Sequence, residues 1–205
     1  MYKGERFSGY SHLLGSVLAV AGLVMLMVTA SRDGDPWKIV SVAIYGSTLV
    51  LLFSFSTLYH SLKGRAKSIF RKFDHVSIYV LIAGTYTPFT LVTLRSTWGW
   101  TLFGMVWALA ILGTILDILH RQGSRALQMA IYLIMGWLVI IAMPQLMDAL
   151  PTAGIAWLVA GGLFYTVGII FYAIDERMRH AHGIWHLFVL AGSISHYMAV
   201  FFYVV

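Results

Sequence analysis

The sequence contains no cysteine, and this absence limits the chemistry open to the chain. Disulfide bonds and thiolate metal sites are excluded, so any metal ion must be held by histidine, aspartate, glutamate or water. Internal repeats, low-complexity segments and long linkers are also missing from the sequence. We therefore expect residues 1–205 to form a single domain.

Charge is scarce as well, since charged residues make up 11% of the chain and hydrophobic residues 60%. Soluble domains carry about a quarter charged residues and about half apolar residues, so this composition predicts an integral membrane protein. A membrane-spanning helix needs about 20 mainly apolar residues. Seven stretches of this kind cover residues 8–30, 38–61, 74–94, 98–118, 125–147, 153–174 and 183–205. The predicted fold is an all-α bundle of seven transmembrane helices, with the first stretch interpreted as a retained helix rather than a signal peptide.

The net charge of +6 indicates membrane topology rather than nucleic-acid binding, because the basic residues lie in alternate connections. Connections rich in lysine and arginine stay in the cytoplasm. The basic connections hold Lys3, Arg6, Lys63, Arg65, Lys67, Arg71, Lys72, Arg121, Arg125, Arg177 and Arg179, and the others hold Arg32, Lys38 and Arg95. We therefore predict a cytoplasmic amino terminus and an outside carboxyl terminus.

Two histidines four residues apart, His182 and His186, begin the last apolar stretch. Residues at this spacing share one face of a helix, so both imidazoles can point at one object. Imidazole is the commonest metal ligand, and ionisable residues inside a membrane suggest a functional site. Taken alone, the pair also fits interfacial histidines that bond lipid headgroups or carbonyl groups.

Span counting places further polar residues at the same depth as this pair. His60 ends the second stretch, Asp74 begins the third, and Ser56 lies one turn deeper than His60. Three histidines leave a zinc ion with an open position, as in catalytic zinc sites. Asp74 could compensate the ionic charge, ligate the metal or act as a general base on water, and Ser56 could bond the water, Asp74 or an oxyanion.

Other polar residues have more than one interpretation. His196 lies about 15 Å beyond His186 along the same helix, where it could line a cavity or be a buried histidine with its own partner. His12 could support the site or pack at the interface. Asp117 is expected to pair with Arg121, four residues later. Tryptophans near predicted span ends are expected to anchor the helices at the interface, namely Trp37, Trp98, Trp157 and Trp185.

Three motifs resemble the signatures of the progestin and adiponectin receptor family. They are the segment from Glu5 through His12, Ser56-x-x-x-His60 followed by Phe73-Asp74, and His182-x-x-x-His186. The chain looks most similar to the bacterial hemolysin III branch. The resemblance implies a seven-helix fold with zinc held by His60, His182 and His186, and Asp74 and Ser56 nearby. It also implies a bacterial inner-membrane location and a link to membrane-lipid homeostasis, while related alkaline ceramidases suggest hydrolysis of lipid amides.

Two functions remain open at this point. One is a zinc-dependent intramembrane hydrolase of lipid amides or esters, with Asp74 and Ser56 as its catalytic residues. The other is a non-enzymatic membrane sensor or regulator in which zinc is a structural clasp. Pore formation has less support, because the spans carry few ionisable groups away from the histidine cluster. A membrane lipid is the expected substrate or ligand.

Overall fold

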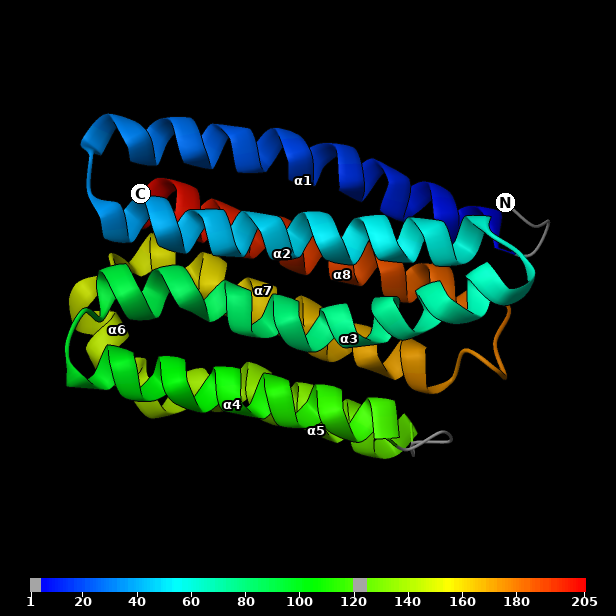
Figure 1. Cartoon of the computed structure of the whole chain (residues 1–205). Coiled ribbons are helices and arrows are strands. Elements are labelled where there is room, and N and C mark those ends of the chain that lie inside the picture. The colour runs from blue at the N-terminus through cyan, green and yellow to red at the C-terminus, as the bar shows by residue number, and fades with distance from the viewer. Residues whose placement is uncertain (1–4, 120–124) are drawn as a thin grey trace.

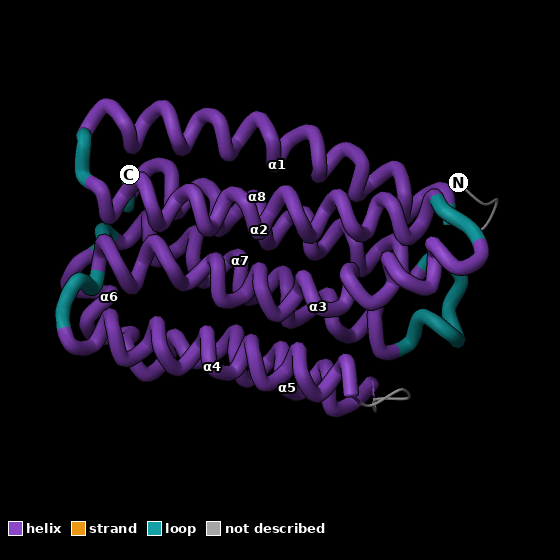
Figure 2. Tube along the Cα trace, viewed as in Figure 1, coloured by secondary structure: helices purple, strands orange, loops and turns teal. Residues whose placement is uncertain are grey.

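The computed structural model describes residues 5–119 and 125–205, and all regular structure within them is helical. Seven helical segments of these residues are long and apolar enough to cross a membrane. They lie side by side in one bundle, and consecutive segments run in opposite directions (Figure 1 and Figure 2). The predicted all-α, seven-span fold is therefore confirmed.

Five of the segments are single helices. They are α1 (Arg6–Asp33), α2 (Pro36–Ser61), α4 (Thr97–Leu119), α7 (Thr152–Ala173) and α8 (Ala181–Tyr203). The turn between α1 and α2 follows the sequence closely. Gly34 adopts a left-handed conformation with φ 69° at the end of α1, and the Asp35 carboxylate accepts a hydrogen bond from the Trp37 amide at 2.8 Å. Pro36 occupies the first turn of α2, where its missing N–H costs no hydrogen bond.

The other two spans change helix type along their length. The third span consists of α3 (Gly64–Pro88) and a π-helical turn, Phe89–Thr93. The fifth consists of α5 (Arg125–Trp137), a 3-10 turn, Leu138–Ala142, and α6 (Met143–Ala149). Each of these spans has a proline next to one change, Pro88 at the end of α3 and Pro144 at the start of α6, after the 3-10 turn. Proline lacks the backbone N–H that continues an α-helix, so the predicted span 125–147 is two helices in series.

The start of α3 differs from the prediction. The third apolar stretch was expected to begin at residue 74, but α3 begins at Gly64. At about 1.5 Å per residue, Asp74 is therefore about 15 Å inside the helix rather than at its start. The reason is that the basic segment before Asp74 continues the helix, so the onset of apolar residues does not mark the first helical turn.

Helices α7 and α8 pack closely because small residues lie between them. A Cβ atom on Gly168 would meet the Phe188 Cβ at 2.7 Å and the Trp185 ring at 2.9 Å, and one on Gly161 would overlap the His196 ring. Gly161 and Gly168 therefore lie at the contact between the two helices. Trp185, expected at the interface, is instead buried in this contact, with 7% of its surface exposed.

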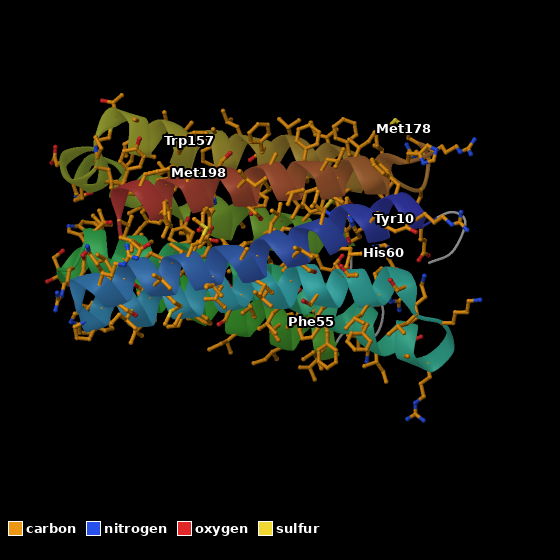
Figure 3. All side chains as sticks on the ribbon, turned by 90° about the horizontal axis from the view of Figure 1, so that it is seen from above. Tyr10, Phe55, His60, Trp157, Met178 and Met198 are labelled. Carbon is orange, nitrogen blue, oxygen red and sulfur yellow. The ribbon has the colours of Figure 1, made fainter. Side chains whose placement is uncertain are left out.

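One end of the bundle, which we call the histidine end, is where α1 begins, α2 ends, α3 begins, α7 ends and α8 begins (Figure 1). His60 lies toward this end and Trp157 toward the other (Figure 3). The described members of the predicted cytoplasmic connections belong to this end, while Lys3 and Arg121 lie outside the described residues. Cytoplasmic sidedness of the histidine end stays a prediction.

Candidate metal centre

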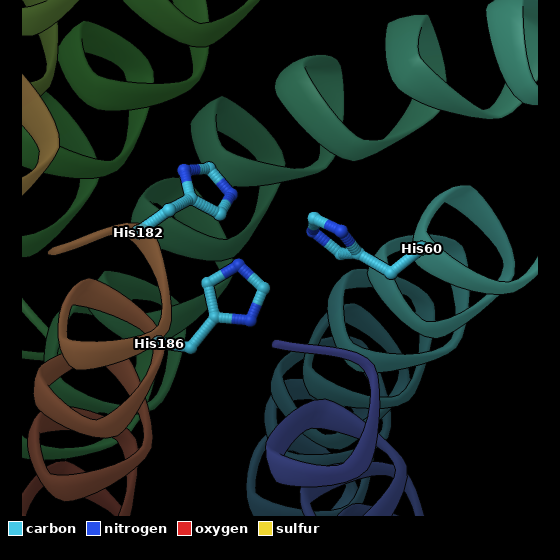
Figure 4. A group of neighbouring side chains, drawn as sticks. All are labelled: His60, His182 and His186. Carbon is cyan, nitrogen blue, oxygen red and sulfur yellow. The ribbon is translucent and has the colours of Figure 1, made fainter. Parts of the chain in front are cut away.

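Three imidazole rings converge at the histidine end (Figure 4). His60 comes from the last turn of α2, and His182 and His186 come from the first two turns of α8. The ring centroids are 5.3 Å apart for His60 and His182, 4.9 Å for His60 and His186, and 4.8 Å for His182 and His186. One nitrogen of each ring lies within 4.8 Å of the other two. The three histidines predicted from the sequence are thus close enough to bind one metal ion.

Two of the rings have one nitrogen fixed by an acceptor. His182 Nδ1 lies 2.7 Å from the Asp175 carboxylate, and His186 Nδ1 lies 3.1 Å from the backbone carbonyl of Ser8. A carbonyl or ionised carboxylate oxygen can only accept a hydrogen bond, so Nδ1 carries the proton in both rings. Their Nε2 atoms then keep the lone pair that a metal ion needs.

The third ring, His60, differs from the other two because its nitrogens lack hydrogen-bond partners among the described residues. It is 3% exposed, and neither of its nitrogens has a hydrogen-bond partner within the described residues. Its Nδ1 is 3.5 Å from the Glu5 carboxylate. A buried polar group without a partner costs about 1–3 kcal/mol, and an ion shared with His182 and His186 would remove that cost. Imidazole nitrogens suit zinc, so these residues fit a zinc ion.

Asp74 and Ser56, the predicted catalytic pair, face each other across α3 and α2. The Asp74 carboxyl group lies near the Ser56 hydroxyl and within electrostatic range of His182. Ser56 is fully buried, and its hydroxyl does not reach hydrogen-bond geometry with any described group. Both side chains line the same cavity as the three histidines. The structure therefore places the predicted acid and alcohol beside the cluster.

His12 from α1 also belongs to this neighbourhood. Its ring stacks on His186, with centroids 3.6 Å apart and planes 15° from parallel, and it meets Phe53 edge-on. Only 3% of its surface is exposed. Neither ring nitrogen has a hydrogen-bond partner in the described part of the chain. His12 is therefore buried beside His186, where it could support the cluster.

His196 lies away from the cluster, as its spacing predicted. Its Nε2 donates to the Leu158 carbonyl at 3.0 Å, and its Nδ1 has no partner among the described residues. Asp117 bonds Gln128 and lies 4.0 Å from His75. Its predicted pairing with Arg121 falls outside the described residues.

Sequence reasoning missed the roles of Glu5, Ser8 and Asp175, which contact the histidines from outside, and of Arg125, which bonds Asp175. Asp175 accepts hydrogen bonds from Arg125 at 2.6 Å and from His182 at 2.7 Å. Burial raises the pKa of Asp175, but these hydrogen bonds and the Arg125 charge outweigh it and hold the pKa at about 2. The sequence signals were the position of Glu5 and Ser8 within the first motif and the place of Arg125 among the topology cations, whereas Asp175 lies in no periodic pattern.

A cavity of about 810 Å³ opens from the cluster into the bundle. Its histidine end is lined by polar groups that include His60, Asp74 and His182, and its deeper part by residues that include Leu81, Trp137 and His196. Polar residues therefore surround one end of the cavity, while aliphatic and aromatic side chains dominate the rest. This shape suits an amphipathic molecule whose polar group lies at the histidines.

Together, the bundle and the cluster define a multi-pass membrane protein with three histidines placed to bind a metal ion. A model of the family described as haemolysin-III related matches residues 1–197. The chain is 42% identical to hemolysin-3 of Bacillus cereus over 203 residues, which cover 98% of this chain and 92% of the relative. It is 30% identical to the human monocyte to macrophage differentiation factor, covering 95% and 82% of the two chains. An adiponectin receptor protein of Drosophila melanogaster is 23% identical, with 93% of this chain and 48% of the receptor covered. The chain belongs to the haemolysin-III related family, which confirms the resemblance stated from its motifs.

Proposed function

We propose that this protein is a zinc-dependent hydrolase that cleaves lipid amides or esters in a bacterial inner membrane. The observation that carries the proposal is the three-histidine cluster at the polar end of the 810 Å³ cavity. A catalytic zinc site has three protein ligands and one open position, and His60, His182 and His186 supply the three ligands. The cavity gives a lipid chain room inside the bundle while its polar group lies at the cluster.

A bound zinc ion would supply Lewis acidity and lower the pKa of water. The chain's own residues do the remaining work. Asp74, near His182, is placed to accept a proton from the attacking water and to return it to the leaving group. Ser56 has a buried hydroxyl without a hydrogen-bond partner among the described residues, so it can donate a hydrogen bond to the carbonyl oxygen as negative charge develops. The buried surroundings strengthen both interactions by excluding bulk water.

The test is turnover of fluorescent lipid amides, ceramides included, and lipid esters by purified, zinc-loaded protein in vesicles. His186→Ala and Asp74→Asn should each lower the rate at least 100-fold. Asp148→Asn changes an exposed carboxylate on α6 at the opposite end of the bundle, so it should keep the original rate. Equal rates for Asp74→Asn and the unchanged protein would refute the proposal.

A structural role for zinc is the alternative, and one observation favours it. The ligands come from α2 and α8, while Ser8 of α1 contacts His186 and Glu5 contacts His60. An ion in the cluster would thus hold three helices together and could stabilise one state of a membrane sensor. The protein would then bind zinc and lose stability on chelation, yet release no product from any lipid in the panel. Dye release from vesicles at low protein density would instead indicate pore formation.

A further inference from the structure

Asp175 lies in the short segment between α7 and α8, outside the membrane-spanning helices, and contacts a predicted zinc ligand. Its Oδ2 atom accepts hydrogen bonds from His182 Nδ1 at 2.7 Å and from Arg125 Nη2 at 2.6 Å. The Asp175 side chain is only 10% exposed, whereas the neighbouring Glu176 side chain is 86% exposed. One largely buried carboxylate oxygen therefore joins a histidine of α8 to an arginine of α5.

This contact determines which nitrogen of His182 is free. A neutral imidazole carries a single proton, and an ionised carboxylate can only accept a hydrogen bond. With Asp175 at Nδ1, the proton is held there and the lone pair stays on Nε2. We propose that Asp175 is a positioning residue that locks His182 in the Nδ1–H form, and that Arg125 holds Asp175 in place for this purpose.

Arg125 is itself fixed by two contacts besides Asp175. Its guanidinium lies over the Tyr172 ring of α7, 4.0 Å from the ring centroid, and its Nη1 is 3.3 Å from Glu176. The Tyr172 contact restrains the guanidinium from the side away from solvent, because Tyr172 is buried. Two hydrogen bonds, from Arg125 to Asp175 and from His182 to Asp175, thus connect α5, the α7–α8 segment and α8. A movement of α5 would therefore displace Asp175 and change the orientation of His182.

Among the three groups that contact the histidines from outside, Asp175 is the one whose role a single substitution can test. The acceptor for His186 is a backbone carbonyl, which no side-chain change removes, and Glu5 lies 3.5 Å from His60 while also bonding Lys67. Partners of metal-bound histidines typically contribute 10–100-fold to metal affinity. We therefore expect a loss of zinc affinity in this range when Asp175 is replaced.

The inference rests on the proposed zinc site, but its primary test needs no zinc and no substrate. Nitrogen NMR of metal-free protein in detergent at about pH 8, where ordinary histidines are neutral, reports the tautomer of each imidazole. His182 should be in the Nδ1–H form in the unchanged protein and in Asp148→Asn, which changes an exposed carboxylate at the opposite end of the bundle. Asp175→Asn should populate the Nε2–H form, because the amide can donate to Nδ1, and should bind zinc 10–100-fold more weakly. Asp175→Glu restores the carboxylate and should return His182 toward the Nδ1–H form.

Arg125→Gln serves as a second variant if Asp175→Asn does not fold as judged by circular dichroism and gel filtration. It leaves the carboxylate in place but removes its anchor, so a mixture of tautomers supports the proposal. An unchanged tautomer and unchanged zinc affinity in Asp175→Asn, or in Arg125→Gln if only that variant folds, would overturn it. Failure of lipid turnover with the expected tautomer shift would refute the hydrolase and leave this inference intact.

Discussion

Ser56 is the residue whose burial most needs a functional explanation. Its hydroxyl is buried between α2 and α3, near Asp74 but without hydrogen-bond geometry to any described group. Alanine is nearly isosteric and would not leave a large cavity. Loss of stability on substitution should therefore be small, which separates a role in chemistry from a role in folding.

Ser56→Ala should lower lipid hydrolysis by about 100–1,000-fold, the usual effect of removing one donor to a developing oxyanion. Its zinc content and melting temperature should stay close to those of the original protein. Ser54→Ala, a half-buried serine on the same helix, provides the matched control and should retain full activity. A Ser56→Ala enzyme with undiminished turnover would remove Ser56 from the mechanism.

The three histidines could be predicted because helical spacing and span counting fix their face and depth. His182 and His186 share a face by their spacing, and His60 reaches them because α2 ends where α8 begins. Asp175 could not be predicted in the same way. It lies in a segment without a repeating pattern, and its contact with His182 depends on how the chain turns between two helices. Arg125 counted only as a topology signal until its partners were visible.

Helices α7 and α8 depend on glycine for their close contact, and two adjacent glycines of α7 differ in this respect. A side chain on Gly161 would overlap the His196 ring, whereas a Cβ atom on Gly162 would have no neighbour within 4 Å. The sequence of α7 is rich in small residues, but it does not indicate which of them faces α8. The helix starts were also hard to place, as the early beginning of α3 shows.

Gly161→Ala should destabilise the protein by about 1–3 kcal/mol, the usual cost of overpacking a core. Gly162→Ala should be neutral or stabilising by up to about 1 kcal/mol, since alanine favours a helix over glycine. The unfolding free energies of the two variants in mixed detergent provide the comparison. Equal stability of the two variants would contradict the close packing of α7 against His196.

The bundle as a whole should be more stable with zinc than without it. A ligand present at 100 times its dissociation constant stabilises the folded state by about 2.7 kcal/mol. We expect chelation to lower the melting temperature and added zinc to restore it. His60→Ala and His186→Ala should abolish this response, while His196→Gln should preserve it. A zinc-dependent shift that survives in His60→Ala would place the ion elsewhere.

The absence of cysteine makes the orientation of the molecule directly measurable. Arg177→Cys at the histidine end and Asp148→Cys at the opposite end both replace exposed residues. The predicted topology requires a membrane-impermeant maleimide to label Asp148→Cys in intact cells and Arg177→Cys only after lysis. The reverse pattern would put the histidine end outside.

The three histidines of the cluster come from the second span and from the seventh, and the Ser8 carbonyl of the first span accepts a hydrogen bond from His186. During synthesis His60 leaves the ribosome long before α8 does, so no partly made chain can offer all three imidazoles to one ion. Tight zinc binding would begin only when the final helix has entered the membrane and met the first two. Zinc retention would then indicate that all seven helices have assembled. Chains that stall during synthesis, or that insert without α8, would be recognisable because they do not retain zinc.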